Sequence, residues 1–453
     1  MDPAPQTTPS SDPGRPRPVL DKREAFAVTI GIVVGAGIFR TPSLVAGAAP
    51  GELAMLLAWV AGGLLSLAGA LCYAELATAY PQAGGDYAYL HRAYGRRLAF
   101  LYAWARLTVI QTGSIVLLAY VVGDYMRQIV DLGAWSSPVY AAATVVLLTA
   151  CNWWGVRQGT GLQNLLTLVE VLGLCLVIAA GLLFAPDAPA VPVATDADGG
   201  SLGLVLVFVL LTYGGWNEAV YLTAEVRDAR RWMPRILGLS LVVIAALYVL
   251  ANLAYLRVLG MGGMAASDAV AADMMRAVFG GPGATLMSAI VVVAALTSAN
   301  ATLITGARGV YAVGRDVRAL AAIGRWDVRH GSPRAAVLLQ GGLSLALVAL
   351  AATALDGFRM AVEYTAPVFW LFFLLVGVAL FVLRRRDPDA PRPFRVPLYP
   401  VLPLLFCATS AFLLYASLAH TGLGALVGVA VLATGALLLP FVDPPHPQPE
   451  SLP

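Results

Sequence analysis

Long runs of apolar residues, separated by short polar segments, recur along almost the whole sequence. Each run covers about 20 residues, which is enough for an α-helix to cross the roughly 30 Å hydrocarbon core of a bilayer. The pattern therefore predicts an all-α polytopic membrane protein with about twelve spans in one transmembrane domain, residues 22–441. The expected spans are residues 25–48, 53–79, 97–128, 137–155, 162–184, 201–223, 234–258, 283–313, 334–354, 358–384, 397–419 and 421–441.

The composition supports a membrane protein. Of the 453 residues, 59% are hydrophobic and 12% are charged, whereas soluble domains carry about 25% charged residues. Residues 1–21 are rich in Pro and Ser and lack the apolar centre of a signal peptide. We expect this segment and the Pro-rich residues 442–453 to be disordered cytoplasmic tails.

The basic residues are distributed unevenly between alternate loops. They cluster in the segments 15–23, 92–97, 227–235, 308–334 and 384–395, which all lie on the same side if the chain crosses the membrane at each expected span. Short cytoplasmic loops carry an excess of Lys and Arg. The asymmetry therefore predicts that both termini are cytoplasmic, in a protein of the cytoplasmic membrane.

Two of the expected spans contain residues that disfavour a continuous helix. The first includes "TIGIVVGAGIFRTPSLVAG", residues 29–47, and the sixth includes "LLTYGGWNEAV", residues 210–220. In a helix interior, Gly costs about 1 kcal/mol and Pro about 3 kcal/mol relative to Ala. Interrupted helices at positions 1 and 6 fit two inverted five-helix repeats followed by two further helices, and they point to a transporter's binding site.

An interrupted helix offers backbone groups to a ligand. Unpaired backbone groups cost several kcal/mol each in hydrocarbon, so they persist only where they line a cavity. N–H groups at the start of one half-helix attract an anion, and C=O groups at the end of the other attract a cation. This pair of partial charges matches the carboxylate and ammonium of an α-amino acid. The alternative is that the glycines only permit close helix packing, but two clusters with polar neighbours favour binding.

Six motifs, in order along the chain, carry a family resemblance. They resemble the amino acid–polyamine–organocation (APC) superfamily, and within it the L-type amino acid transporter family and its bacterial relatives. The motifs are "GAGIF" at 35–39, "CYAELATAYPQAGGDYAYLHRAYG" at 72–95, "YGGWN" at 213–217, "EVRDARRWMPR" at 225–235, "SANATLITGAR" at 298–308 and "RPFRVPLYPVLP" at 392–403.

The resemblance implies alternating access around a central amino acid site, with the backbone of both interruptions holding the substrate. N–H groups are expected from Gly35, Ala36 and Gly37, carbonyl groups from Val33, Leu211 and Gly214, and one lining side chain from Asn217.

Three features depart from the family pattern. Ala36 stands where a serine is frequent, and Leu211 stands where larger members carry an aromatic gate, so we expect small or medium neutral substrates. Eukaryotic members pair with a single-span glycoprotein through a cysteine in the loop after the third span. The corresponding residues 131–138 contain no cysteine, so we expect no disulfide-linked heavy chain.

Ionisable residues inside membrane spans are functional candidates. Arg40 either selects an acidic substrate side chain, pairs with Glu218, or extends towards the outer surface. Glu218 either pairs with Arg40 or contacts the substrate directly. Arg106 is expected to cap a polar pocket, and Glu75 to take a structural role at the cytoplasmic gate.

Glu170 lies about eight residues into the fifth expected span, roughly 12 Å deep at 1.5 Å per residue. By the resemblance, it occupies a place where many relatives have a lysine close to the first interruption. Three interpretations stay open. Glu170 ligates Na⁺ together with Thr297 and Ser298, it carries a proton, or it is structural and either protonated or paired with Arg106.

The sequence does not predict an enzyme. It contains no catalytic constellation, no Cys/His spacing typical of zinc or haem, and no other sign of a metal or cofactor. The arginine-rich loops are explained by topology rather than by nucleic acid. We therefore expect a secondary active amino acid transporter that works as an exchanger or as a symporter coupled to H⁺ or Na⁺. The alternatives are a carrier of polyamines, organocations or acidic amino acids, a channel, or a substrate sensor on the same fold.

Overall fold

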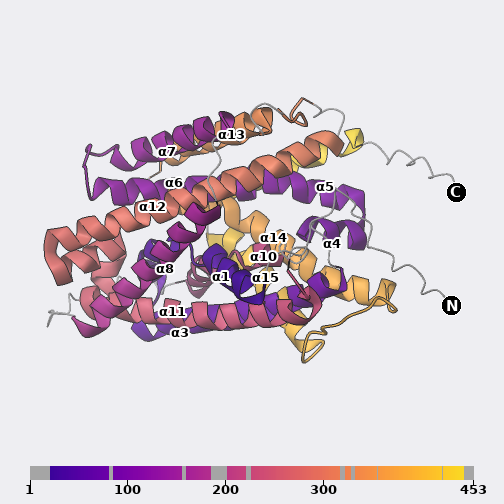
Figure 1. Ribbon diagram of the computed structural model, residues 1–453, viewed down its shortest axis with the longest axis horizontal. Helices are drawn as coiled ribbons and strands as arrows, with labels where there is room; N and C mark the ends of the chain where they lie inside the picture. The colour runs from indigo at the N-terminus through magenta and orange to yellow at the C-terminus, as the bar shows by residue number, and fades with distance from the viewer. Residues whose placement is uncertain are drawn as a thin grey trace, which may run out of the picture.

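The computed structural model describes residues 21–442, apart from 81–84, 156–159, 185–200, 221–225, 317–321, 328–331, 355 and 421. These described residues form an all-helical protein without β-strands, in which long helices run alongside one another (Figure 1). The expected tails, residues 1–21 and 442–453, lie almost entirely outside the described residues.

The helices follow one another closely along the chain. In order they are α1 (Lys22–Val33), η1 (Ala36–Phe39), α2 (Thr41–Ala48), α3 (Glu52–Ala79), α4 (Gly85–Tyr94), α5 (Arg96–Ala105), η2 (Arg106–Gln111), α6 (Thr112–Arg127), α7 (Ser136–Trp153), α8 (Thr160–Leu183), α9 (Leu202–Thr212), α10 (Trp216–Ala219), α11 (Ala229–Ala265), α12 (Val270–Asp316), α13 (Arg334–Ala351), α14 (Gly357–Arg386), α15 (Val401–His420), α16 (Leu423–Leu437) and η5 (Leu439–Phe441).

The predicted polytopic architecture is confirmed. Each of the expected spans coincides with helix in the described residues, and 9 helical segments have the length and composition needed to cross a membrane. The first expected span is divided among α1, η1 and α2. The two expected spans that remain correspond to α7, which has polar residues at its ends, and to α16, which is shorter.

The segment between the seventh and eighth expected spans, residues 259–282, is largely helical. α11 continues to Ala265 and α12 begins at Val270, each with one kink. The kinks fall at Gly260 (φ 67°) and Gly280 (φ 71°), where glycine adopts left-handed backbone angles at little steric cost. The two glycines therefore mark kinks between helical pieces.

Two further local features differ from the sequence expectation. The segment between the second and third expected spans is not a loop throughout, because Gly85–Tyr94 forms helix α4. The third span is one continuous helical rod that contains a π-helical segment, η2, between α5 and α6. The Thr112 hydroxyl donates to the Leu107 carbonyl at 2.9 Å across this wider turn. Such π segments frequently occur at functional sites.

The interrupted helices lie at the centre of the molecule. α1 and α10 pack against each other in the middle of the bundle (Figure 1), and α2 packs against α9. α3 and α11 run together along one side, while α6, α7, α12 and α13 form the other side.

Candidate functional site

The first interruption occurs where the sequence predicts it. α1 ends at Val33, and Gly35 is extended, with φ −111° and ψ 175°. A short 3₁₀ turn, η1, follows, and α2 then begins with Pro42 in its first turn. Proline suits a first helical turn because its missing N–H would be unpaired there in any case.

The second interruption is a turn at Tyr213–Gly215 between α9 and α10. Gly215 has φ 103°, and a Cβ placed on it would lie 2.9 Å from the carbonyl oxygen of Ile32. A side chain is therefore excluded here by backbone angle and by contact. The next residue, Trp216, anchors α10 through ring contacts with Tyr73 (5.0 Å between centroids) and Phe373 (5.3 Å).

The two interruptions are in direct contact. The hydroxyl of Tyr248 on α11 donates to the Val33 carbonyl at 3.0 Å and lies 3.4 Å from the Thr212 carbonyl. It thus joins the last residues of α1 and α9. The sequence analysis did not identify Tyr248. The available signal was a tyrosine inside an apolar span, because a buried hydroxyl requires a hydrogen-bond partner.

The glycines of the first interruption have different surroundings. A Cβ on Gly31 would collide with the Thr167 side chain on α8, so Gly31 permits close packing of two helices. A Cβ on Gly35 would meet nothing within 4 Å, and one on Gly37 would make ordinary contact with Thr212 at 3.6 Å. Open space therefore adjoins Gly35.

The carbonyl groups that were predicted to accept from the substrate ammonium already accept other hydrogen bonds in part. The Val33 carbonyl accepts from Tyr248, and the Leu211 carbonyl accepts from the Gly214 N–H at 3.0 Å. Leu211 and Gly214 are partly exposed, whereas Val33 is buried. The predicted lining residue Asn217 is also buried, as is Ala36.

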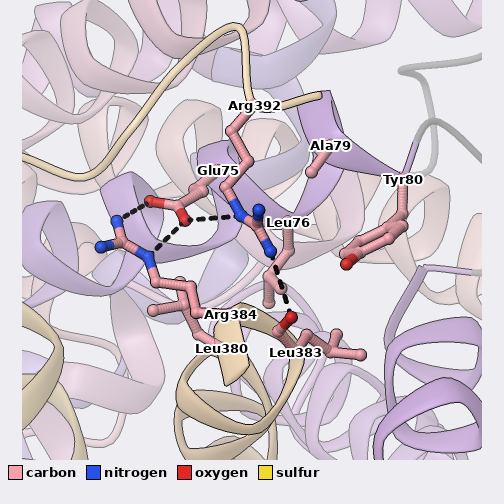
Figure 2. Close-up of a pocket in the computed structure, with 8 residues that line it drawn as sticks. All are labelled: Glu75, Leu76, Ala79, Tyr80, Leu380, Leu383, Arg384 and Arg392. Atoms are coloured by element: carbon pink, nitrogen blue, oxygen red, sulfur yellow. Dashed lines mark hydrogen bonds and ion pairs between the residues drawn. The ribbon is translucent and has the colours of Figure 1, made fainter. Parts of the chain in front are cut away.

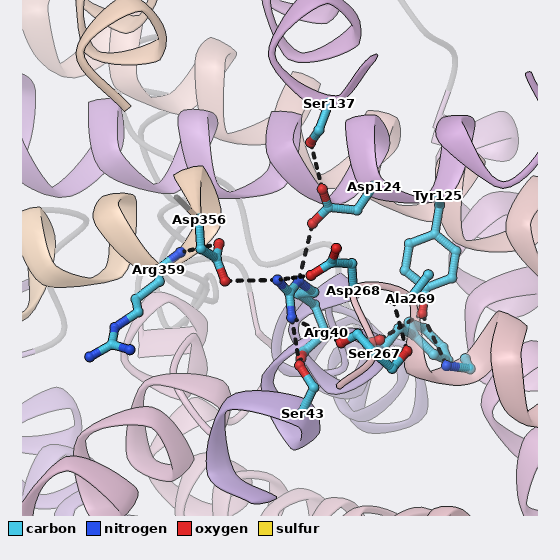
Figure 3. Close-up of polar contacts among 12 residues, drawn as sticks. Arg40, Ser43, Asp124, Tyr125, Ser137, Ser267, Asp268, Ala269, Asp356 and Arg359 are labelled. Carbon is cyan, nitrogen blue, oxygen red and sulfur yellow. Dashed lines mark hydrogen bonds and ion pairs between the residues drawn. The ribbon is translucent and has the colours of Figure 1, made fainter. Parts of the chain in front are cut away.

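Arg40 belongs to a buried charge cluster (Figure 3). Its guanidinium bonds Asp124 at 3.1 Å, Asp268 at 3.1 Å and Asp356 at 2.8 Å, and the residue is only 3% exposed. The predicted pairing of Arg40 with Glu218 is wrong. The alternative, that the Arg40 side chain extends towards the outer surface, is wrong as well. The partners lie 84 or more positions away along the chain, which is why sequence patterns did not reveal them.

Glu218 pairs instead with Arg106, at 2.8 Å. Arg106 also donates to the Tyr102 hydroxyl at 3.2 Å, and Tyr102 donates to Asp86 on α4 at 2.9 Å. Burial raises the pKa of Asp86 to about 6, and the nearby charge of Glu218 adds to this effect. The expected polar pocket at Arg106 is therefore an ion-pair network, and the alternative pairing of Arg106 with Glu170 is wrong.

Glu170 is buried on α8, at 3% exposure, and its Oε1 has no hydrogen-bond partner among the described residues. It lies within electrostatic range of Tyr248, the residue that joins the two interruptions. Thr297 and Ser298 lie on α12, which packs against α8. The Thr297 hydroxyl donates to the Val293 carbonyl in its own helix, at 2.8 Å.

Glu75 forms a separate structural clamp (Figure 2). Both of its oxygens accept from Arg384, at 2.7 and 2.5 Å, and Oε2 also accepts from the Val396 N–H at 2.6 Å. Arg392 adds an ion pair at 3.7 Å. These contacts tie α3 to the end of α14 and to the segment that follows it.

Asp387 extends this connection to α4. It accepts from Arg92 at 3.0 Å and from Tyr80 at 3.1 Å. The hydrogen bond from Arg92 holds the pKa of Asp387 below its usual value. α4, which lies on the cytoplasmic side in the expected topology, is thus attached to the C-terminal end of α14, the tenth expected span.

A polytopic helical protein in which two interrupted helices meet at the centre has the architecture of a membrane transporter. The chain belongs to the amino acid permease family, which matches residues 20–438. Members of this family are transporters and not enzymes.

Several amino acid transporters are similar over most of their length. The human b(0,+)-type amino acid transporter 1 is 28% identical over 400 residues, which cover 86% of this chain and 80% of that protein. The human large neutral amino acids transporter small subunit 2 is 28% identical over 424 residues, covering 91% and 78%. The rabbit (Oryctolagus cuniculus) form of that subunit is 29% identical over 427 residues, covering 91% and 78%.

Proposed function

We propose that the protein is a secondary active transporter of small or medium neutral amino acids, with both termini in the cytoplasm and a place in the cytoplasmic membrane. The observation that carries this proposal is the contact between the two interruptions, with open space beside Gly35. Unwound backbone in a membrane interior persists where it lines a ligand cavity.

The substrate carboxylate binds the N–H groups at the start of η1, from Gly35, Ala36 and Gly37. The ammonium binds carbonyl groups at the end of the preceding half-helices. A carbonyl oxygen has two lone pairs, so the hydrogen bond from Tyr248 leaves Val33 able to accept a second donor. Leu211 and Gly214 complete the ammonium side.

The charged residues favour a neutral substrate. Arg40, the candidate selector for an acidic side chain, is surrounded by three carboxylates. Glu218, the candidate selector for a polyamine, is paired with Arg106. Binding a charged substrate at either residue would require breaking an existing ion pair.

Glu170 is the coupling residue in this proposal. Its buried carboxyl group has an oxygen without a hydrogen-bond partner among the described residues, and it lies within electrostatic range of the tyrosine that joins the interruptions. A buried carboxyl group is favoured in its protonated form, so we propose that it carries a proton. Ligation of Na⁺ with Thr297 and Ser298, and simple substrate exchange, are the alternative outcomes of the test.

We further propose that the transporter acts without a disulfide-linked heavy chain. The name of one group of relatives, "small subunit", refers to a partner subunit. The segment of this chain that follows the third span, residues 128–138, contains no cysteine that could form such a link.

Uptake into proteoliposomes tests the substrate class. The purified protein is reconstituted and supplied with labelled alanine, and unlabelled serine, valine, arginine, glutamate and putrescine are added as competitors. Serine and valine should compete strongly, whereas the three charged compounds should not. Stronger competition by glutamate or putrescine than by serine would contradict a neutral amino acid site.

A further inference from the structure

The third span carries two opposite charges at well-separated positions. Arg106 begins the π-helical segment η2, and Asp124 lies in the last turn of α6. They are 18 residues apart on one continuous helical rod, which corresponds to roughly 27 Å. The two charges therefore lie at clearly different depths along this span.

Each charge pairs with an interrupted helix. Arg106 binds Glu218, which follows the interruption of the sixth span by three residues. Asp124 binds Arg40, which follows Gly35 in the first span by five residues. The charged residue of each interrupted helix therefore lies just beyond the break.

We propose that Arg106 and Asp124 are positioning residues that hold the two gates of the transporter closed against the third span. The Arg106–Glu218 pair is the inner latch, on the side of α4. The Arg40–Asp124 pair is the outer latch, on the side of the kinked α11–α12 connection. Opening one side separates one pair while the other pair stays formed. This proposal rests on the proposed transport function.

The two latches differ in strength. The outer pair is deeply buried, with side chains 3% and 11% exposed, and Arg40 is further held by Asp268 and Asp356. The inner pair is more accessible to solvent, at 17% and 33%. Removing one partner of a buried ion pair costs more than removing one partner of a partly solvated pair. The resting protein therefore opens more readily towards the side of Arg106.

Accessibility of a single cysteine at position 211 tests the latches. Leu211→Cys is introduced after Cys72, Cys151, Cys175 and Cys407 have been replaced, and a membrane-impermeant maleimide is applied from either side of oriented vesicles. Glu218→Gln should raise labelling from the inner side about two- to fivefold. Asp124→Asn should raise labelling from the outer side about tenfold. If Asp124→Asn does not fold, Asp356→Asn tests the same latch, because Asn also caps a helix.

Two control variants distinguish the loss of one latch from a general loosening of the protein. Arg127→Gln removes an exposed ion pair with Asp131 on the same helix and should leave labelling unchanged on both sides. The exchange Arg106→Glu with Glu218→Arg should restore the wild-type pattern. The proposal would be overturned if labelling rose equally on both sides, or if the charge exchange did not restore the wild-type labelling pattern. Because labelling requires no transport, this result is independent of uptake measurements that test the substrate.

Discussion

The phenolic hydroxyl of Tyr248 donates to the carbonyl of Val33 at 3.0 Å, at the point where α1 ends. The same hydroxyl lies 3.4 Å from the carbonyl of Thr212, where α9 ends. One side chain from α11 thus fixes the relative position of the two unwound segments. The proposed ammonium site depends on this position, because its carbonyl groups come from both half-helices.

Replacing Tyr248 with Phe tests this dependence. The substitution keeps the ring contacts with Trp59 and Tyr213 and removes only the hydroxyl. We expect KM for alanine to rise about 3- to 20-fold, the range that corresponds to one hydrogen bond inside a membrane protein. Tyr140→Phe, which removes an exposed hydroxyl bonded to Val130, should leave KM unchanged. An unchanged or lower KM for Tyr248→Phe would show that the hydroxyl does not organise the site.

Glu170→Gln tests the proposed coupling. With the wild type, an imposed inward H⁺ gradient should accelerate alanine uptake, and an imposed Na⁺ gradient should not. The Gln variant cannot take up and release a proton at this position, so the stimulation should disappear while exchange of internal for external alanine continues. Stimulation by Na⁺ would instead favour cation ligation. If neither gradient affects the wild type and the variant exchanges normally, Glu170 has no role in coupling.

Glu75 should matter for stability rather than for substrate affinity. Glu75→Gln leaves two arginines, Arg384 and Arg392, without their common carboxylate partner. Breaking a buried ion pair from one side costs about 3–5 kcal/mol, so a clear fall in the unfolding temperature is expected. Thermal unfolding in detergent measures it, with Arg127→Gln as the exposed control. A Glu75→Gln protein with wild-type stability and a raised KM would contradict the structural assignment.

Features that depend on neighbouring residues could be predicted from the sequence, whereas contacts between distant residues could not. The spans and both interruptions followed from local composition, because apolar length and helix-breaking glycines act within a few residues. Polar partners could not be found in this way. Asp124, Asp268 and Asp356 converge on Arg40 from three separate parts of the chain, and only the packed bundle brings them together.

Glycine was the least decisive signal in the sequence. Gly31, Gly35 and Gly215 look alike in the apolar pattern, yet the structure gives them different roles. Gly31 allows α1 to approach α8, Gly215 adopts a positive φ, and Gly35 adjoins open space. Gly214 also permits a close approach, since a Cβ there would lie 2.8 Å from the Leu211 carbonyl oxygen and would disturb the backbone.

The stability of the folded protein should depend on pH because of the raised pKa of Asp86. Its pKa, raised to about 6 by burial, is higher in the folded protein than the usual value of 3.8, so ionisation favours unfolding. Glu218 raises this pKa further, while Tyr102, Arg106 and Tyr73 act in the opposite direction. The stabilising contribution is therefore complete below about pH 4 and is lost as the pH rises to 6. Relative to the wild type, Asp86→Asn should gain unfolding temperature across this window, and a pH-independent difference would contradict the assignment.

Binding of labelled alanine by Gly35→Val tests whether the substrate occupies the open space beside Gly35, as proposed for the amino acid site. The φ of −111° suits any residue, and a Cβ meets no protein atom within 4 Å, so the variant should fold normally. Gly342→Val, at an exposed position on α13 that is equally unobstructed, serves as the matched control. In equilibrium binding on purified protein, Gly342→Val should bind alanine like the wild type, whereas Gly35→Val, folded and monodisperse, should not bind it. Wild-type affinity in folded Gly35→Val would place the amino acid site elsewhere.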